Sequence, residues 1–326
     1  MNEFELIENF FTRPPKSKSV ALGVGDDAAL LVPTPGHQLV ASVDMLVGGR
    51  HFFADVDPES LGHKALAVNL SDMAAMGATP RWALLAGALP DPDPEWLAAF
   101  ARGFYALADA HGVDLVGGDT TRGPMNLCVT ILGEVPAGQA ITRAGARVGD
   151  DVYVSGQLGG AALALAALSG WTVLDRAALA ACRERLERPL PRVALGERLR
   201  GVATAMLDVS DGLTGDLGHV LAASQVGAVV DLASVPRPAA LAAKLAGVER
   251  ALALACLLAG GDDYELCFTA HPSASAQIAV IGADVGVPLT RVGVIGAAAG
   301  LVVRDEQGVP MTDIPCGFDH FRDDGS

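Results

Sequence analysis

The chain has 326 residues, of which 51% are hydrophobic and 5% aromatic, and it carries 23 Lys and Arg against 38 Asp and Glu. This length allows two domains and a sizeable core, which Ala, Leu and Val must mostly fill. A formal net charge of −15 argues against a basic surface that binds nucleic acid nonspecifically, so no nucleic-acid partner is expected. Because the protein is acidic, a phosphorylated partner must bind together with cations that offset its negative charge.

Cysteine usage and the N-terminal residues indicate a cytoplasmic protein. The five cysteines are an odd number with no CxxC spacing, which argues against a disulfide framework and against a structural zinc site. The acidic start of the chain lacks the pattern of a signal peptide. One long uncharged stretch, 152–174, is interrupted by four glycines and favours a strand, a turn and a helix over a membrane span. No membrane partner is expected.

Strand and helix patterns alternate along the chain. Apolar runs predict strands at 20–24, 28–32, 39–43, 113–116, 127–133, 151–155, 203–209, 265–269, 289–295 and 300–303. Helices are predicted at 57–76, 95–111, 160–168, 175–188 and 213–223, the first of them opening on Asp57-Pro58-Glu59. The segment 136–151 is interpreted as the connection between two halves. We therefore expect two mixed α/β (α+β) domains, at 1–145 and 146–326.

Six short segments join aspartates to glycine or to an apolar run: Gly25-Asp26-Asp27, Val43-Asp44, Asn69-Leu70-Ser71-Asp72, Gly117-Gly118-Asp119-Thr120-Thr121, Asp208-Val209-Ser210-Asp211-Gly212 and Gly260-Gly261-Asp262-Asp263. Two carboxylates about 4 Å apart repel by roughly 4 kcal/mol at an effective dielectric near 20. Cationic side chains are scarce, so divalent ions are the natural counter-charge wherever such carboxylates converge. Oxygen ligands of this kind suit Mg²⁺, which also bridges to substrate phosphates.

The segments differ in how strongly each one indicates a site. Asn69 and Asp72 lie three residues apart in a helix apolar enough to be buried, so both side chains point to the same place. Taken alone, Gly25-Asp26-Asp27 fits an ordinary hairpin turn, and Asp211-Gly212 fits an ordinary helix start. His51 has no visible partner and is structural by default. Gly118-Asp119 at a strand end, followed by two threonines, favours a functional role by itself, and the whole set favours a site more strongly.

The chain lacks the usual phosphate-binding loop. It contains no GxxxxGK[ST] motif, and its lysines are only Lys16, Lys18, Lys64 and Lys244. A P-loop kinase is therefore excluded. If phosphates bind, magnesium ions must clamp the transferring group and offset its charge.

Five of these motifs, in their order and spacing, resemble those of the thiamine-monophosphate kinase family. They are Gly23-Val24-Gly25-Asp26-Asp27-Ala28-Ala29, the run from Asn69 to Ala78, the run from Gly117 to Gly123, Asp208 to Leu213, and Gly260 to Leu266. The resemblance extends from Phe4 to the ending Gly317-Phe318-Asp319-His320-Phe321. It implies a two-domain fold shared with aminoimidazole ribonucleotide synthetase and selenophosphate synthetase, usually a homodimer. It also implies transfer of the γ-phosphate of ATP to thiamine monophosphate, which yields thiamine diphosphate.

The resemblance also implies roles for individual residues. Eight positions match magnesium ligands: Asp27, Ser42, Val43 through its backbone, Asp44, Asp72, Asp119, Asp208 and Asp211. Four match ATP contacts: Gly118, Asp119, Arg143 and Ser210. Three match positions that hold thiamine monophosphate: His51, Asp262 and Phe318. The domain at 1–145 would then bind ATP and magnesium, and the domain at 146–326 would complete the metal and substrate site.

Three positions depart from the family pattern. Val43-Asp44-Met45 stands where Thr-Asp-Thr is usual, which removes a hydroxyl but keeps a main-chain carbonyl ligand. Asp262 replaces a glutamate, so its contact to substrate would be longer or bridged by water. Phe318 replaces a common tyrosine and keeps the aromatic face without the hydroxyl.

No general base and no covalent phosphoenzyme are assigned, because the nucleophile would be a phosphate oxygen that is already anionic near neutral pH. Two other functions stay open. A ligase of the same superfamily that closes a purine-precursor ring would share the fold but not the Asn-Leu-Ser-Asp and Gly-Gly-Asp-Asp-Tyr-Glu-Leu combination. A noncatalytic nucleotide- or metal-binding regulator would share the fold without turnover, although every magnesium-ligand aspartate is retained.

Overall fold

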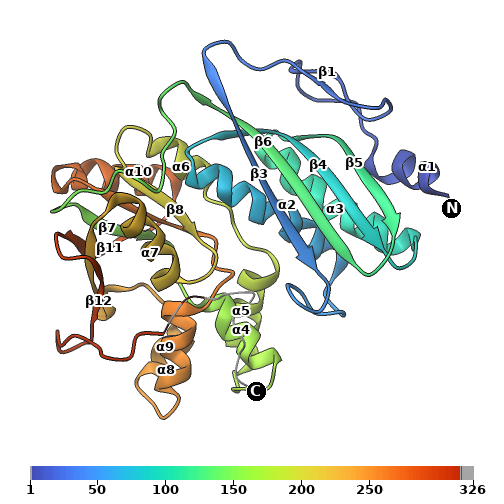
Figure 1. Cartoon of the computed structure of the whole chain (residues 1–326). Helices are drawn as coiled ribbons and strands as arrows, with labels where there is room; N and C mark the ends of the chain where they lie inside the picture. The colour runs from blue at the N-terminus through green and yellow to red at the C-terminus, as the bar shows by residue number, and fades with distance from the viewer. Residues whose placement is uncertain (1, 316, 318–326) are drawn as a thin grey trace. The chain divides into compact units, whose positions relative to one another are not determined.

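The structure is a computed structural model that describes residues 2–315 and residue 317 (Figure 1). The predicted substrate residue Phe318 lies outside these described residues. The chain divides into two compact units, unit 1 with residues 1–140 and 187–193, and unit 2 with residues 141–186 and 194–326. The domain limits at 145 and 146 stay a prediction.

Unit 1 contains a four-stranded sheet with two long helices on one face (Figure 1). Its strands, in spatial order, are β3 (His37–Val47), β6 (Asn126–Pro136), β4 (Thr79–Leu89) and β5 (Asp114–Arg122), and only β4 and β5 run parallel. The helices are α2 (Pro58–Ala75) and α3 (Pro94–His111). Each begins with an aspartate cap and a proline in its first turn, two residue types that are favoured at helix starts.

The two helices of unit 1 approach each other closely at two glycines. A Cβ atom added to Gly62 in α2 would lie 2.0 Å from the carbonyl oxygen of Phe100, and one added to Gly103 in α3 would lie 1.8 Å from that of Glu59. The backbones are therefore in direct contact, and α2 is buried along most of its length, including Leu66 at 0% exposure. This packing fixes α2 against α3.

The N-terminal part of unit 1 begins with α1 (Glu3–Leu6) and the π-helical turn η1 (Ile7–Phe11). Residues 16–34, here called the N-terminal strap, then form the antiparallel pair β1 (Val20–Leu22) and β2 (Leu30–Leu31), which flank the Gly25-Asp26-Asp27 turn as predicted. The strap packs on Trp82 and Val116 of the sheet. Ile131 is paired with Ser42, which faces α2, so the next residue, Leu132, faces away from α2. Trp82 is paired with Leu132 and therefore also faces away from α2. The strap thus covers the face of the sheet opposite the helices, here called the outer face.

Unit 2 contains a six-stranded sheet in the order β12 (Gly300–Arg304), β9 (Gly227–Asp231), β11 (Leu289–Gly296), β7 (Asp151–Ser155), β10 (Glu265–Ala270), β8 (Ala205–Val209). All neighbours are antiparallel except β12 and β9. The helices of the second half are α4 (Gly160–Leu168), α5 (Arg176–Glu187), α6 (Val193–Arg198), α7 (Leu213–Ser224), α8 (Ala239–Leu245), α9 (Arg250–Ala259) and α10 (Ser275–Val285). Short 3₁₀ turns, η2 (Leu232–Ser234) and η3 (Pro272–Ala274), complete the unit. Its core includes the fully buried Val154, Leu163 and Leu217.

Several predicted strand ends are wrong, and two of them bear on the predicted site. The expected strand at 39–43 continues through Asp44 to Val47, because β3 pairs with β6 along its whole length. The expected strand at 113–116 continues through Asp119 to Arg122, because it stays paired with β4. Asp44 and Asp119 therefore lie inside strands rather than beyond them. Among the described residues, no helix has the length and apolar character needed to cross a membrane.

Candidate nucleotide and metal site

A cavity of about 900 Å³ opens in unit 1. One part of its wall is aromatic and apolar, with Phe11, Trp96 and Phe100 among the lining residues. The Trp96 and Phe100 rings are stacked with their centroids 5.3 Å apart, and Phe11 meets Phe100 edge-on at 6.4 Å. A preformed aromatic wall of this kind can hold a flat ring system.

Another part of the cavity wall is polar and is formed by acidic and glycine-rich segments. Asp26 and Asp27 from the strap line the cavity, and so do Gly118 and Asp119 from β5. The predicted positions Asp27, Gly118 and Asp119 are thus brought together around one cavity, although the first lies far from the other two in sequence. All three are exposed, so carboxylates there can meet a charged ligand.

Gly118 is required by the close approach of β5 to β4. Its φ is +155°, and an added Cβ would lie 1.8 Å from the carbonyl oxygen of Leu85. The register between these strands also shifts between Ala83 and Leu84, so the β5 backbone is re-aimed just before Asp119. The glycine and the bulge together set where the Asp119 carboxylate lies.

The helix face predicted for Asn69 and Asp72 is confirmed. The Ser42 hydroxyl donates to Asp72 Oδ2 at 2.5 Å, and the Asp44 N–H donates to Asn69 Oδ1 at 3.1 Å. Both helix residues therefore contact β3, at positions two apart that face α2. Asn69 is fully buried and also donates to the Ala65 carbonyl oxygen at 3.0 Å.

Two further predicted positions of unit 1 lie away from these contacts. The Val43 side chain is 58% exposed on the outer face, so only its backbone is offered for ligation. His51 Nδ1 accepts a hydrogen bond from the Val47 N–H at 3.0 Å, and the His51 carbonyl oxygen accepts from Lys64 Nζ at 3.3 Å. The ring thus stabilises the end of β3 through one nitrogen.

The described residues contain no group of three or more His, Cys, Asp or Glu side chains placed to hold a metal ion. A magnesium site built by protein side chains alone is therefore not formed in this part of the chain. Magnesium commonly binds through one or two carboxylates, with waters and substrate phosphates supplying the other oxygens. Asp27 and Asp119, on the wall of one cavity, fit that mode.

In unit 2 the segments around Ser210 and Asp262 are brought together. Asp262 donates its N–H to the Ser210 carbonyl oxygen at 2.9 Å. The N–H groups of Ser210 and Asp211 both donate to Asp216 Oδ2, at 3.1 and 3.0 Å. Burial raises the pKa of Asp216 to about 7, although these two hydrogen bonds oppose the rise.

The remaining predicted positions of unit 2 lie near this segment or in the strand that leads to it. Asp208 is a nearly buried residue of β8, two residues before Ser210. The Arg143 carbonyl oxygen accepts from the Ser224 hydroxyl at 3.2 Å. Burial is the largest influence on the pKa of Asp216 and raises it, whereas the Arg143 guanidinium has a smaller, lowering effect. The structure thus gathers Ser210, Asp211 and Asp262 at one place in unit 2.

The Asp262–Tyr264 segment is held in a strained backbone conformation. Asp262 has φ +67° and Tyr264 has φ +50°, and each non-glycine residue in this region costs on the order of 1–3 kcal/mol. The Tyr264 hydroxyl donates to Asp262 Oδ1 at 3.0 Å. Strain of this kind persists where the surroundings over-determine it, which is common at binding sites.

Asp263 anchors this strained segment from inside unit 2. Its Oδ2 accepts from the Gly159 N–H at 2.6 Å, at the start of α4. Its Oδ1 is buried and has no hydrogen-bond partner among the described residues. Burial raises the pKa of Asp263 well above its ordinary value of 3.8, so the protonated form is favoured in the folded protein.

We expect the free energy of unfolding to fall as pH rises from the ordinary carboxyl pKa towards the raised pKa of Asp263. The folded state then keeps a proton that the unfolded state has lost, and one such group gives a slope of at most about 1.4 kcal/mol per pH unit. Asp263→Asn removes this titration. Urea unfolding of both proteins from pH 5 to pH 8 should therefore show the variant gaining stability relative to wild type as pH rises. A pH-independent difference would refute the protonated state of Asp263.

Two family models match the chain: AIR synthase related protein, N-terminal domain, over residues 25–135, and AIR synthase related protein, C-terminal domain, over residues 147–306. The fold and the site thus define a two-domain member of the AIR synthase related class, and the predicted mixed α/β fold is confirmed.

Comparison with individual proteins shows which family within this class the chain belongs to. Thiamine-monophosphate kinase from Salmonella typhimurium is 44% identical over 323 residues, which cover 98% of each chain. The crystal structure of thiamine-monophosphate kinase from Stenotrophomonas maltophilia K279a has 46% identity and a TM-score of 0.86, and covers 95% of this chain and 98% of that one. A structure described as AaThiL complexed with AMPPCP and TMP has 29% identity and a TM-score of 0.77, and covers 94% and 93% of the two chains. The chain belongs to the thiamine-monophosphate kinase family of phosphate-transferring enzymes.

The aromatic wall of the cavity was missed by sequence reasoning. Phe4, Ile7 and Phe11 recur at spacings of three and four, the pattern of one helix face, and all three line the cavity. Attention to that stripe could have identified the N-terminal residues as part of the site.

Proposed function

We propose that the protein transfers the γ-phosphate of ATP directly to thiamine monophosphate, in line and with magnesium, giving thiamine diphosphate. One observation carries this proposal: Asp27, Gly118 and Asp119, three positions that match family ligands, line a single cavity with an aromatic wall. The similarity to a protein complexed with AMPPCP and TMP supports both substrates. A purine-precursor ligase and a noncatalytic regulator are disfavoured by the full-length similarity to kinases.

The cavity accounts for nucleotide binding without a phosphate-binding lysine. A volume of about 900 Å³ accommodates a nucleotide. We propose that the Phe11 and Trp96 side of the cavity holds the base, with the buried Phe100 ring supporting Trp96 from behind, whereas the side formed by Asp27 and Asp119 faces the phosphates. Carboxylates facing phosphates would repel them unless cations lie between, which is the reason for magnesium in this proposal.

In this proposal the protein side chains bind the two substrates and orient them for transfer. Magnesium, when bound, offsets the negative charge of the phosphates and of the transferring group. Asp27 and Asp119 would hold it, and Asp44 and Asp72 are further proposed ligands. Asn69 accepts a hydrogen bond from the Asp44 backbone and so fixes its position. The Ser42 hydroxyl fixes the Asp72 carboxylate in the same way. No side chain needs to remove a proton, because the attacking phosphate oxygen is already an anion. Rate enhancement then comes from alignment and charge neutralisation.

The unit 2 positions keep their predicted roles within this proposal. Asp208 and Asp211 are proposed magnesium ligands, and Arg143 and Ser210 are proposed ATP contacts. Asp262 is a proposed contact to thiamine monophosphate, together with His51 and Phe318. The hydrogen bond from Tyr264 supports a fixed orientation of the Asp262 carboxylate.

We also propose that the protein is a homodimer of the cytoplasm. Strand β3 lies at the edge of its sheet, and on the outer face Leu39, Val43 and Met45 are 55%, 58% and 52% exposed. An exposed apolar edge strand promotes association unless it is covered, and a second copy would cover it. The four cysteines among the described residues are free, as a reducing compartment favours.

The decisive experiment is an assay of purified protein with ATP, Mg²⁺ and thiamine monophosphate. We expect one thiamine diphosphate for each ADP, and no turnover of a purine-precursor acceptor. ATP made chiral at the γ-phosphate should give inversion at phosphorus, since transfer is direct. Absence of thiamine diphosphate would overturn the function, and retention would overturn direct transfer.

Alkylation of Cys128 offers an independent test of where the nucleotide binds. Cys128 lines the cavity and is partly exposed, whereas Cys182, Cys256 and Cys267 are buried. Burial, together with the nearby Asp44 charge, raises the pKa of Cys128, so labelling with iodoacetamide should be run above pH 8 and followed on the peptide that contains Cys128, because the chain has a fifth cysteine, Cys316. Mg–AMPPCP at ten times its Kd should slow labelling about tenfold, and AMPPCP without metal should protect less. Equal labelling rates with and without Mg–AMPPCP would place the nucleotide elsewhere.

A further inference from the structure

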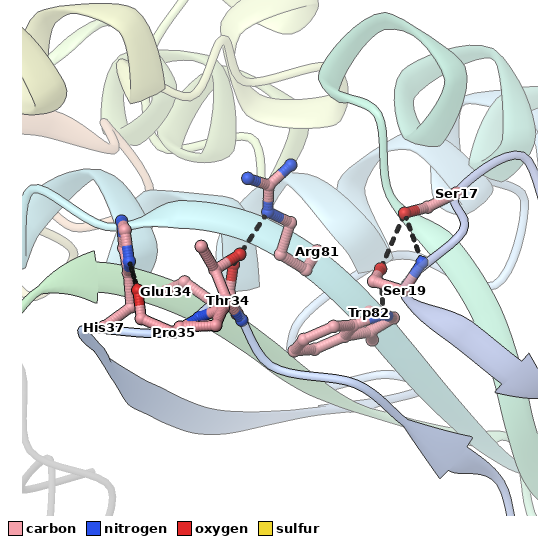
Figure 2. Close-up of polar contacts among 8 residues, drawn as sticks. All are labelled: Ser17, Ser19, Thr34, Pro35, His37, Arg81, Trp82 and Glu134. Carbon is pink, nitrogen blue, oxygen red and sulfur yellow. Dashed lines mark hydrogen bonds and ion pairs between the residues drawn. The ribbon is translucent and has the colours of Figure 1, made fainter.

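The N-terminal strap is held to the sheet of unit 1 by two buried carboxylates, one near each end (Figure 2 shows Glu134 and the serine contacts). Asp114 is 7% exposed and Glu134 is 2% exposed. Neither residue lines the cavity and neither matches a family ligand position. Buried carboxylates require partners, and in both cases the strap supplies them.

The first anchor lies at the start of β5. Asp114 accepts hydrogen bonds from the N–H groups of Lys16 and Ser17, at 2.8 and 3.0 Å. The Ser17 hydroxyl lies 2.6 Å from the Ser19 hydroxyl, and Ser19 in turn accepts from Trp82 Nε1 at 3.1 Å (Figure 2). Trp82 is fully buried, so this end of the strap is fixed to the interior.

The second anchor joins the far end of the strap to β6 and β4. Glu134 accepts from the Thr34 N–H at 2.5 Å and from the Thr34 hydroxyl at 2.7 Å, and Arg81 Nε donates to it at 3.2 Å (Figure 2). Burial alone would raise the pKa of Glu134, but the bonds from Thr34 and Arg81 outweigh it and lower the pKa. The anchor is therefore an ionised, charge-assisted contact.

The loop between the anchors carries Asp26 and Asp27 into the wall of the cavity. Both aspartates are exposed, and the Asp27 N–H donates to Asp26 Oδ1 at 2.8 Å within the loop. The β1–β2 pair on Trp82 and the two carboxylate anchors thus determine where the loop lies.

We propose that Asp114 and Glu134 are positioning residues that fix Asp27 at the cavity for magnesium–nucleotide binding. This inference rests on the proposed function of the cavity. Acting through the strap, the two carboxylates contribute to nucleotide affinity without touching the ligand. If a substitution removes an anchor, Asp27 can sample many positions in the free protein. Each binding event must then order the loop, and the free energy of this ordering lowers the affinity.

The test measures Mg–AMPPCP affinity by calorimetry and strap mobility by hydrogen exchange, in wild type, Glu134→Gln and Asp114→Asn. We expect roughly tenfold weaker binding in each variant and faster exchange confined to residues 16–34, because a charge-assisted contact is replaced by a neutral one. Glu59→Gln is the control, since Glu59 pairs with Arg102 at 3.3 Å on exposed helix surfaces away from the strap. Its affinity and strap exchange should match wild type.

A milder pair of variants keeps the inference testable if a buried substitution impairs folding. Thr34→Val deletes only the hydroxyl that donates to Glu134, and Thr34→Ser keeps it. Binding should weaken in the valine variant and recover in the serine variant. Unchanged affinity in the anchor variants and in Thr34→Val, with wild type binding normally, would overturn this inference alone. A wild-type protein that binds no Mg–AMPPCP would overturn the proposed function first.

Discussion

Asp119→Asn is expected to lower the turnover number by about 10²–10³-fold while leaving the fold intact. Removal of one preorganised group that stabilises transition-state charge typically has an effect of this size. Asp119 lies in β5 on the cavity wall with an exposed side chain, so amidation removes charge without disturbing the core. Turnover should be measured at saturating substrates over a range of Mg²⁺ concentrations, with circular dichroism melts as the check on folding.

Asp72→Asn should behave in the same way, and a surface aspartate provides the comparison. Asp91 is 80% exposed and forms a solvent-exposed pair with Arg122 at 3.5 Å, which contributes little to stability. Asp91→Asn should keep activity within a few-fold of wild type. If Asp119→Asn did the same with an unchanged magnesium requirement, the shared metal role of these aspartates would be refuted.

Gly103→Ala is expected to cause the largest loss of stability of the single substitutions considered. The added methyl group would lie 1.8 Å from the backbone carbonyl of Glu59, and backbone atoms cannot move aside as a side chain can. Overpacking of a core typically costs about 1–3 kcal/mol, and this contact belongs at the top of that range or above it. Urea unfolding should show a lower midpoint with a similar slope.

Gly218 provides the matched control for that substitution. It also lies within a helix, α7, but an added Cβ would meet no atom within 4 Å. Gly218→Ala should leave stability unchanged or raise it by about 0.5–1 kcal/mol, because alanine favours the helix. Equal stability of the two alanine variants would contradict the close packing of α2 on α3.

Local patterns predicted much of the fold. The strand Asp151–Ser155 and the helix Gly160–Leu168 begin and end at the predicted residues. Strand β4 was missed, because Trp82 packs under the strap while alternate residues face the helices, so its sequence from Trp82 to Leu89 carries no polar side chain. A strand covered on both faces loses the alternation that identifies strands. β9, α8, α9 and α10 were also not predicted.

The site was predictable only where its residues are close in sequence. Asn69 and Asp72 share a helix face, and spacing alone gives that. The approach of Asp27 to Asp119 depends instead on contacts between the strap and the sheet, such as that of Lys16 with Asp114. The approach of Ser210 to Asp262 depends on the pairing of β8 with β10. Pairings between distant segments leave no periodic signal in either partner.

The first helical turns of the chain have a practical consequence for anyone who expresses this protein. Phe4 and Ile7 line the cavity of unit 1, and Phe4 is 80% exposed. A polyhistidine tag fused upstream of Asn2 would therefore begin within a few residues of the cavity that contains the proposed magnesium ligands. Its imidazoles would compete for divalent ions there and distort metal titrations. Quantitative work should use protein from which such a tag has been cleaved.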